Sequence, residues 1–215
     1  MLEMKRFTVN PYGENCYVVY DGETQQAVVI DDGAYSAVEK QAIYNFIQEN
    51  QLAVSRQLLT HAHFDHILGV GDLYGKYGAK VEFSQNDDYL YFNLADQLQW
   101  VPWADVPVGI APVGRYLEED DTIEVGKYAF RVICVPGHSR GGLCYYEEKE
   151  KMLFCGDSLF QHSIGRTDLP GGSEKELLAA LKGKVMVLPE NVVVYPGHGP
   201  CTTIGDERQN NPFIQ

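Results

Sequence analysis

The sequence predicts a mixed α/β domain that spans residues 1–215. Two observations carry this prediction. Runs of β-branched and apolar residues alternate with helical segments, and turns containing Gly, Pro and Asp separate them. The 215-residue length also fits one large domain better than two, and no low-complexity tract, charge block or Gly/Ser linker divides the chain. We therefore expect one domain that buries a substantial core.

The N-terminal third is expected to contain two strands followed by a helix. Residues 15–20 and 27–30 are rich in strand-forming side chains, and the turn-rich Asp21-Gly22-Glu23 separates them. Ser36 and Glu39 then have the spacing of a capping box, in which each side chain binds the backbone N–H of the other residue. The apolar face of this helix comprises Val38, Ala42, Ile43, Phe46 and Ile47.

Further strands and another helix are expected towards the C-terminus. The β-branched runs at 131–135 and 192–195 predict strands. Ser173 and Glu176 repeat the capping-box spacing, and Gly183 is the expected end of the helix that they begin. The apolar residues of this second helix are Leu177, Leu178 and Leu181. The alternation of strands and helices thus continues along the chain.

Residues 89–103 stand out for their aromatic side chains, which are Tyr89, Tyr91, Phe92, Trp100 and Trp103. A helix packed on a sheet is the preferred interpretation. The alternative is a substrate lid or an oligomer contact, where aromatic residues are enriched. The pattern alone leaves both interpretations open.

The composition is that of an acidic protein without a recognisable export or membrane segment. The formal net charge is −13, so we expect no nucleic-acid partner, because a phosphate backbone favours a basic surface. No signal peptide is recognisable, and no apolar run reaches the roughly 18 residues that span a membrane. The cysteine count is odd and no Cys-x-x-Cys pair is present, which is typical of a reduced, cytoplasmic chain. We expect a small-molecule substrate, and a homo-oligomer stays open.

The strongest chemical signal is the segment Thr60-His61-Ala62-His63-Phe64-Asp65-His66. It follows the apolar pair Leu58-Leu59 and is therefore expected in the loop that leaves a strand. Four costly polar side chains beside an apolar strand need a reason to be there. Neutral imidazole and carboxylate are ligands that zinc, iron and manganese accept, so metal binding supplies that reason. In a tight loop, residues one apart can converge on one ion and the next pair can serve a neighbouring ion.

Three further ligand-type residues follow apolar strands in the same way, namely His138, Asp157 and His198. Each stands after a run that ends in Pro-Gly or Gly, where Gly lets the backbone turn sharply and Pro ends a strand. If these strand ends share one edge of the fold, the seven side chains meet in one place. His162 lies near Asp157 in sequence, but a single histidine is more often a satisfied polar residue than a ligand, so its role stays open.

The order of these motifs resembles the metallo-β-lactamase superfamily. The resemblance implies an αββα sandwich, in which two mixed sheets face each other, helices lie outside, and metal ions bind at one edge. It further implies two divalent metal ions, with zinc expected and iron or manganese as alternatives. By this resemblance the first metal would be held by His61, His63 and His138. The second would be held by Asp65, His66 and His198, and Asp157 would bridge the two.

Within the superfamily, the closest pattern is the glyoxalase II branch of hydroxyacylglutathione hydrolases. Residues 154–160 and 165–172 resemble that branch around and after its bridging aspartate. The resemblance implies that Arg166 binds a substrate carboxylate, as a guanidinium can through two hydrogen bonds. The sequence departs from the branch in carrying Asp31-Asp32-Gly33 in place of Asp-Pro-Gly. We also expect it to lack the helical C-terminal domain that supplies further glutathione contacts in full-length members, so glutathione specificity stays open.

The function that this pattern favours is hydrolysis of a thioester by metal-bound hydroxide. Metal binding lowers the pKa of water towards 7. A thiolate leaving group has a pKa of about 8.5 and departs without a strong general acid. Asp65 is the side chain that could assist catalytically, to the extent that the metal leaves it free.

Three other functions remain as alternatives. A mononuclear iron persulfide dioxygenase of the same branch would use His61, His138 and Asp157 as a facial triad. A lactonase of the same fold is a second alternative, and a metal-binding protein without catalysis is a third. Hydrolysis of β-lactams is not expected, because the best-known such enzymes carry Cys or another ligand where Asp157 stands and are exported.

Overall fold

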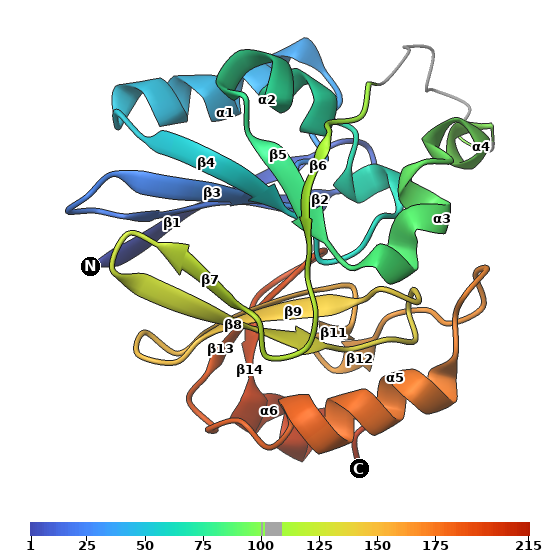
Figure 1. Cartoon of the computed structure of the whole chain (residues 1–215). Helices are drawn as coiled ribbons and strands as arrows, with labels where there is room; N and C mark the ends of the chain where they lie inside the picture. The colour runs from blue at the N-terminus through green and yellow to red at the C-terminus, as the bar shows by residue number, and fades with distance from the viewer. Residues whose placement is uncertain (100, 102–108) are drawn as a thin grey trace.

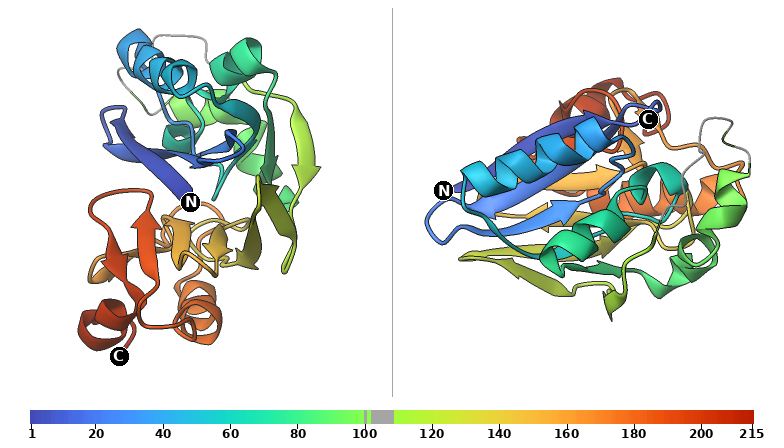
Figure 2. Two further views of the ribbon diagram at one scale, coloured as in Figure 1. Left: turned by 90° about the vertical axis from the view of Figure 1, so that its left-hand side faces the viewer. Right: turned by 90° about the horizontal axis from the view of Figure 1, so that it is seen from above.

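The computed structural model, which describes residues 1–99, 101 and 109–215, contains two β-sheets that pack face to face. Helices cover both outer faces, so that the layers follow in the order helices, sheet, sheet, helices (Figure 1). The left view of Figure 2 shows these layers edge-on, and its right view shows α1 (Ala37–Glu49) lying along the outer face of the first sheet. This architecture is the expected αββα sandwich.

The first sheet contains six strands in the order β1-β2-β3-β4-β5-β6. Its first three strands are antiparallel, whereas the pairs from β3 to β6 are parallel, so the sheet is mixed. Helix α1 connects β3 to β4, and α2 (Val70–Tyr77) lies between β4 and β5. The strands are β1 Leu2–Val9, β2 Glu14–Asp21, β3 Gln26–Ile30, β4 Ala53–Leu58, β5 Lys80–Phe83 and β6 Val113–Tyr116.

The second sheet has the order β14-β13-β10-β9-β8-β7 and is also mixed, because β10 and β13 are parallel. Helices α5 (Glu174–Ala180) and α6 (Ile204–Asn210) cover its outer face (Figure 1). A small two-stranded ribbon joins β11 (Leu159–Phe160) to β12 (Ser163–Ile164). The remaining strands are β7 Thr122–Val125, β8 Tyr128–Cys134, β9 Leu143–Glu147, β10 Met152–Gly156, β13 Val193–Pro196 and β14 Thr202–Thr203.

The two helices expected from capping boxes are both present. At α1 the box is complete, because the Ser36 side chain accepts from Glu39 N and the Glu39 side chain accepts from Ser36 N. At α5 the Ser173 side chain accepts from Glu176 N. The prediction that Gly183 ends this helix is wrong. The chain continues in a π-helical turn, Leu181–Val185, because Leu181 and Val185 are both fully buried and hold that turn against the second sheet.

The main core lies between the two sheets, where apolar side chains of both inner faces meet. Tyr17 from β2 contacts Phe154 from β10, with ring centroids 5.1 Å apart, and Phe154 stacks on Tyr195 from β13 at 5.0 Å. These residues belong to one buried cluster that also includes Phe130 and Ile30. Burying this apolar surface stabilises the pairing of the sheets. It also fixes the ends of β4, β8, β10 and β13 at one edge of the sandwich.

The aromatic segment forms two short helices, α3 (Asp88–Tyr91) and α4 (Leu94–Leu98). Tyr91 is fully buried and packs against Phe83, and the Tyr89 hydroxyl donates to the Pro170 carbonyl at 2.9 Å. The helix interpretation therefore holds for the described part of the segment, whereas Trp100 and Trp103 lie outside the described residues. All five cysteines are free. Across residues 1–99, 101 and 109–215, no helix is long and apolar enough to cross a membrane.

Candidate metal centre

The seven histidines and aspartates singled out by the sequence come together at one edge of the sandwich. His61 and His63 lie in the loop after β4, and Asp65 and His66 lie in the 3₁₀ turn Phe64–His66 that follows. The other three residues, His138, Asp157 and His198, follow β8, β10 and β13. Their ligand atoms form overlapping groups, and the atoms of each group all lie within 4.8 Å of one another. The first group is His61, His63 and His138, and the second group is Asp65, His66 and His198. The condition that the strand ends share one edge is therefore met.

Three imidazole nitrogens face one another in the first group. His138 Nε2 lies 2.9 Å from His63 Nδ1 and 3.2 Å from His61 Nε2. The opposite nitrogen of His138, Nδ1, donates to the Arg166 carbonyl at 2.8 Å, which leaves a lone pair on Nε2. Thr60 Oγ1 can accept from His61 Nδ1 at 3.2 Å, since its own proton goes to Asp31. His61 and His138 thus each leave a lone pair on Nε2, close to His63 Nδ1, an arrangement that suits a divalent metal ion.

The second group places carboxylate oxygens beside two more histidines. His198 Nε2 lies 3.2 Å from Asp65 Oδ2, and His66 Nε2 lies 3.4 Å from Asp157 Oδ1. Asp157 Oδ2 is 3.6 Å from both His138 Nε2 and His198 Nε2, so this carboxylate lies between the two groups. His66 Nε2 and Asp157 Oδ1 are buried without a hydrogen-bond partner. Buried polar atoms without partners are costly, and a bound cation would satisfy these two.

Burial and charge set the protonation states that metal binding requires. Burial lowers the pKa of His61 well below its usual value, and burial with the neighbouring His138 lowers the pKa of His63 to about 3. Burial acts to raise the pKa of Asp157, but the nearby His66, together with other histidines, brings it below its usual value. Burial also acts to raise the pKa of Asp65, but His66 and the hydrogen bond with His198 together bring it below its usual value. His61 and His63 therefore offer neutral imidazoles and the two aspartates are ionised, as metal ligands must be.

Asp31 supports the centre from behind and was noted in the sequence only as part of the Asp31-Asp32-Gly33 triplet. It accepts from Thr60 N and Thr60 Oγ1, both at 2.7 Å, and its Oδ2 lies 3.1 Å from His66 Nδ1. Its backbone has a φ of +53°, a conformation that costs energy for a residue other than Gly. Gly33 is required next to it, because a Cβ there would collide with the Asp65 carbonyl. This strained turn thus fixes the loop that carries four of the seven residues.

Arg166 lies beside the centre, but its guanidinium faces another residue. Its Nε and NH2 donate to the two carboxylate oxygens of Asp168, each at 2.7 Å, and its side chain is 62% exposed. Its backbone carbonyl is the acceptor for His138 Nδ1. The residue therefore orients one of the three clustered imidazoles through its backbone and presents a positive charge close by.

His162 does not join the seven residues. Its Nε2 lies 2.9 Å from Asp206 Oδ2, and its backbone N–H donates to the Glu207 carboxylate. Both Glu207 oxygens accept further hydrogen bonds, from Thr202 Oγ1 and Asn211 Nδ2. The cluster is satisfied internally, which favours a structural role in holding α6 to the β11–β12 ribbon.

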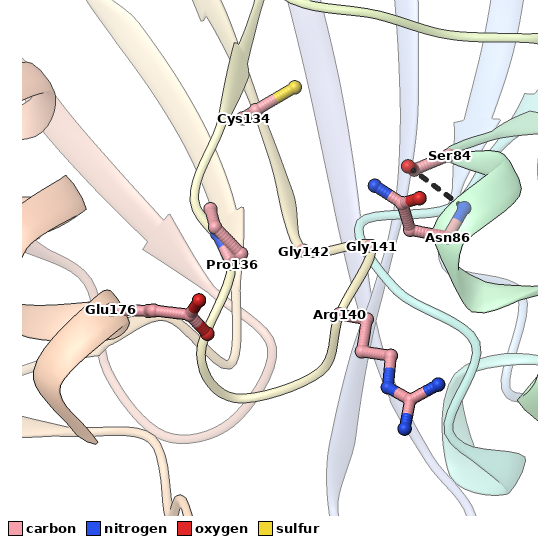
Figure 3. Close-up of a pocket in the computed structure, with 8 residues that line it drawn as sticks. All are labelled: Ser84, Asn86, Cys134, Pro136, Arg140, Gly141, Gly142 and Glu176. Atoms are coloured by element: carbon pink, nitrogen blue, oxygen red, sulfur yellow. Dashed lines mark hydrogen bonds between the residues drawn. The ribbon is translucent and has the colours of Figure 1, made fainter. Parts of the chain in front are cut away.

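A cavity of about 300 Å³ lies beside the centre, between residues 84–86 and the loop that carries His138 (Figure 3). It is lined by Ser84, Asn86, Cys134, Pro136, Arg140, Gly141, Gly142 and Glu176. None of these residues belongs to the seven. The cavity is therefore adjacent to the candidate centre and distinct from it.

Comparison with known proteins agrees with the geometry. The family model described as "Metallo-beta-lactamase superfamily" matches residues 9–198, which include all seven residues. The protein named hydroxyacylglutathione hydrolase GloC from Haemophilus influenzae is 31% identical over 207 residues, covering 96% of this chain and 95% of its own.

Two solved structures are similar over nearly their full lengths. TTHA1623, in a di-iron-bound form, is 37% identical with a TM-score of 0.86, covering 97% of this chain and 99% of its own. The BLEG-1 B3 metallo-beta-lactamase is 35% identical with a TM-score of 0.83, covering 99% of this chain and 100% of its own. With the motif order, the sandwich and the family match in agreement, the chain belongs to the metallo-β-lactamase superfamily.

Proposed function

We propose that this protein is a hydrolase with two divalent metal ions that cleaves a thioester such as a hydroxyacylglutathione. The observation that carries the proposal is the pair of adjacent ligand groups with Asp157 between them. His61, His63 and His138 would hold one metal. Asp65, His66 and His198 would hold the other. The buried and unpartnered His66 Nε2 and Asp157 Oδ1 fit such a pair of cations.

Metal ions bound in this way supply a water of lowered pKa and polarise an acyl oxygen, which is the chemistry that ester and thioester hydrolysis requires. The protein's own residues hold the geometry and the charge. The lowered pKa of Asp65 keeps its carboxylate ionised at neutral pH, so it suits a ligand or a proton acceptor better than a proton donor. A thiolate leaving group needs no strong donor, because the pKa of a thiol is about 8.5. A thioester therefore fits this set of residues better than an amide.

The substrate class rests on one relative and one side chain. The curated relative at 31% identity is named for hydroxyacylglutathione hydrolysis. Arg166 lies next to His138 and is mostly exposed, so a substrate carboxylate could replace Asp168 as its bidentate partner. Exchange of one exposed ion pair for another costs little, because such pairs are worth about 0–1 kcal/mol.

The test combines elemental analysis of the purified protein with turnover assays on the same sample. We expect about two metal ions per chain, hydrolysis of S-lactoylglutathione, and loss of both after treatment with a chelator. A lactone and a β-lactam should be assayed in parallel, the latter because BLEG-1 is similar over the whole chain. One iron per chain with oxygen consumption on glutathione persulfide, and no thioester turnover, would reject the proposal in favour of a dioxygenase.

The role of Arg166 is tested by Arg166→Gln, with Arg131→Gln as the matched control. Arg131 is also an exposed arginine paired with an aspartate, Asp120, but it lies on β8 away from the centre. We expect Arg166→Gln to raise KM about tenfold for a thioester that carries a carboxylate, which is about 1.4 kcal/mol of lost binding, with kcat little changed. A neutral thioester should show no such increase. Equal effects on both substrates would show that Arg166 does not bind the carboxylate.

A further inference from the structure

Ala62 stands between His61 and His63. Two side chains, one just before α3 and one in α4, bind its backbone N–H and carbonyl. Asp87 Oδ2 accepts from Ala62 N at 3.0 Å, and Gln97 Nε2 donates to Ala62 O at 3.0 Å. Gln97 Oε1 also accepts from Phe64 N at 3.0 Å. The backbone on either side of His63 is therefore fixed from outside its own loop.

The same Asp87 carboxylate reaches the loop that carries His138. Its Oδ2 accepts from Ser139 Oγ at 2.8 Å, and its Oδ1 accepts from Gly141 N at 2.6 Å. Asp87 is fully buried, and a Cβ on residue 141 would come within 2.7 Å of its carboxyl carbon. Figure 3 shows Gly141 on this loop beside Asn86, the residue that precedes Asp87. One buried carboxylate thus links the loops of all three residues in the first group.

The second group has different supports. The Asp65 carbonyl accepts from Asn10 Nδ2 at 2.9 Å, and the Tyr12 carbonyl lies 3.2 Å from His198 Nδ1. Both supports come from the turn between β1 and β2. Glu14, the first residue of β2, also pairs with His198 in an isolated β-bridge. Asp87 and Gln97 contribute to none of these contacts in the described part of the chain. The second group therefore has supports from the β1–β2 turn that the first group lacks, although Asp31 contacts residues next to both.

We propose that Asp87 and Gln97 are positioning residues for the His61–His63–His138 group and set its metal affinity more strongly than that of the second group. The proposal rests on the metal sites of the proposed function but not on any particular substrate. A carboxylate can accept from all three donors at once. An asparagine in its place would turn an NH₂ group towards at least one of them, so the loops would separate. Loss of a residue that orients metal ligands typically costs about 10–100-fold in metal affinity.

The test measures zinc affinity at each group by competition with a chelator. It uses two background variants, in each of which one of the two groups is disabled. His198→Ala disables the second group, and His63→Ala disables the first. We expect Asp87→Asn to weaken zinc binding about tenfold or more in the His198→Ala background and to leave it nearly unchanged in the His63→Ala background. Asp88→Asn is the matched control, since the Asp88 side chain accepts from Tyr116 and, in the described part of the chain, forms no hydrogen bond with either loop.

Gln97→Ala is a second, milder variant that keeps the proposal testable where Asp87→Asn does not fold. Its control is Gln99→Ala, because Gln99 is exposed at the end of the same helix and, within the described residues, its side chain donates to Asp96. We expect Gln97→Ala to weaken metal binding at the first group more than at the second, and Gln99→Ala to have no effect. Visible absorption of cobalt bound at the first group should change in parallel. Equal loss at both groups, or equal effects of variant and control, would overturn the proposal. A protein that binds two metals yet cleaves no thioester would reject only the proposed function.

Discussion

At the scale of single residues, Asp32 is a buried carboxyl group next to Asp31, which supports the candidate metal centre. It is 2% exposed, and its Oδ1 accepts from Ala34 N at 3.3 Å. Burial raises its pKa to about 7, with the Ala34 N–H and Lys40 acting in the opposite direction. This carboxyl group stands where the glyoxalase II branch has proline. The free-energy cost of burying this carboxyl group in the folded protein should therefore depend on pH.

The sign follows from linkage between protonation and folding. The unfolded chain loses the Asp32 proton near pH 3.8 and the folded chain only near pH 7, so rising pH destabilises the folded state across that interval. Asp32→Asn keeps an acceptor for Ala34 and removes the charge. We expect its stability advantage over the natural chain to grow between about pH 4 and 7 and then stay constant. Urea unfolding of metal-free protein measures this, with Asp120→Asn as an exposed control. A stability difference between the two proteins that does not change with pH would contradict the raised pKa of Asp32.

At the scale of elements, the two helix caps differ although their sequences have the same spacing. The Glu39 carboxylate accepts from Tyr35 N and Ser36 N at 2.9 Å and from Asn10 N at 3.0 Å. It therefore closes the α1 cap and joins it to the β1–β2 turn. Glu176 is exposed and lines the cavity beside the centre, and only its backbone takes part in the α5 cap.

This difference predicts unequal effects of the same substitution. Glu39→Ala should lower the free energy of unfolding by about 1–2 kcal/mol, because it leaves several backbone N–H groups without an acceptor. Glu176→Ala should change it by less than about 0.5 kcal/mol, as exposed substitutions usually do. Denaturant titration of both variants measures the difference. Equal losses would mean that the reciprocal bond at α1 contributes nothing.

At the scale of the whole molecule, the candidate metal ligands come from both sheets. His61 and His63 follow β4 of the first sheet, whereas His138 and Asp157 follow strands of the second. The shared core between the sheets already couples them. Metal ions at this edge would link the sheets a second time, through bonds that exist only in the folded state.

We therefore expect thermal unfolding in one cooperative transition, as one domain over residues 1–215 would show. Zinc should raise the midpoint, because a ligand present at 1,000 times its Kd stabilises the folded state by about 4 kcal/mol. Calorimetry with and without chelator measures both effects. Two separate transitions would show that the sheets unfold independently and that the one-domain prediction is wrong.

Much of this arrangement could be predicted from residues close together in sequence. The strands around Asp21-Gly22-Glu23 and the helix after Ser36 form as expected, because turns, caps and strand propensity act over a few residues. The polar cluster at 61–66 indicated metal chemistry because polar groups beside an apolar strand are costly. Gly183 shows the limit of such local signals. It was expected to end a helix, but the burial of Leu181 and Val185 against the second sheet carries the helical turn past it.

The sequence by itself determined the ligand types, their order along the chain and the strand ends that carry them. Only the tertiary structure decided that His63 faces His138 with nitrogens 2.9 Å apart and that Asp157 lies between two groups. It also decided that Asp87 holds both loops of the first group. The physical reason is that a buried carboxylate gains its partners from residues 25 and 54 positions away. No local pattern encodes such contacts, because the packing of two sheets creates them.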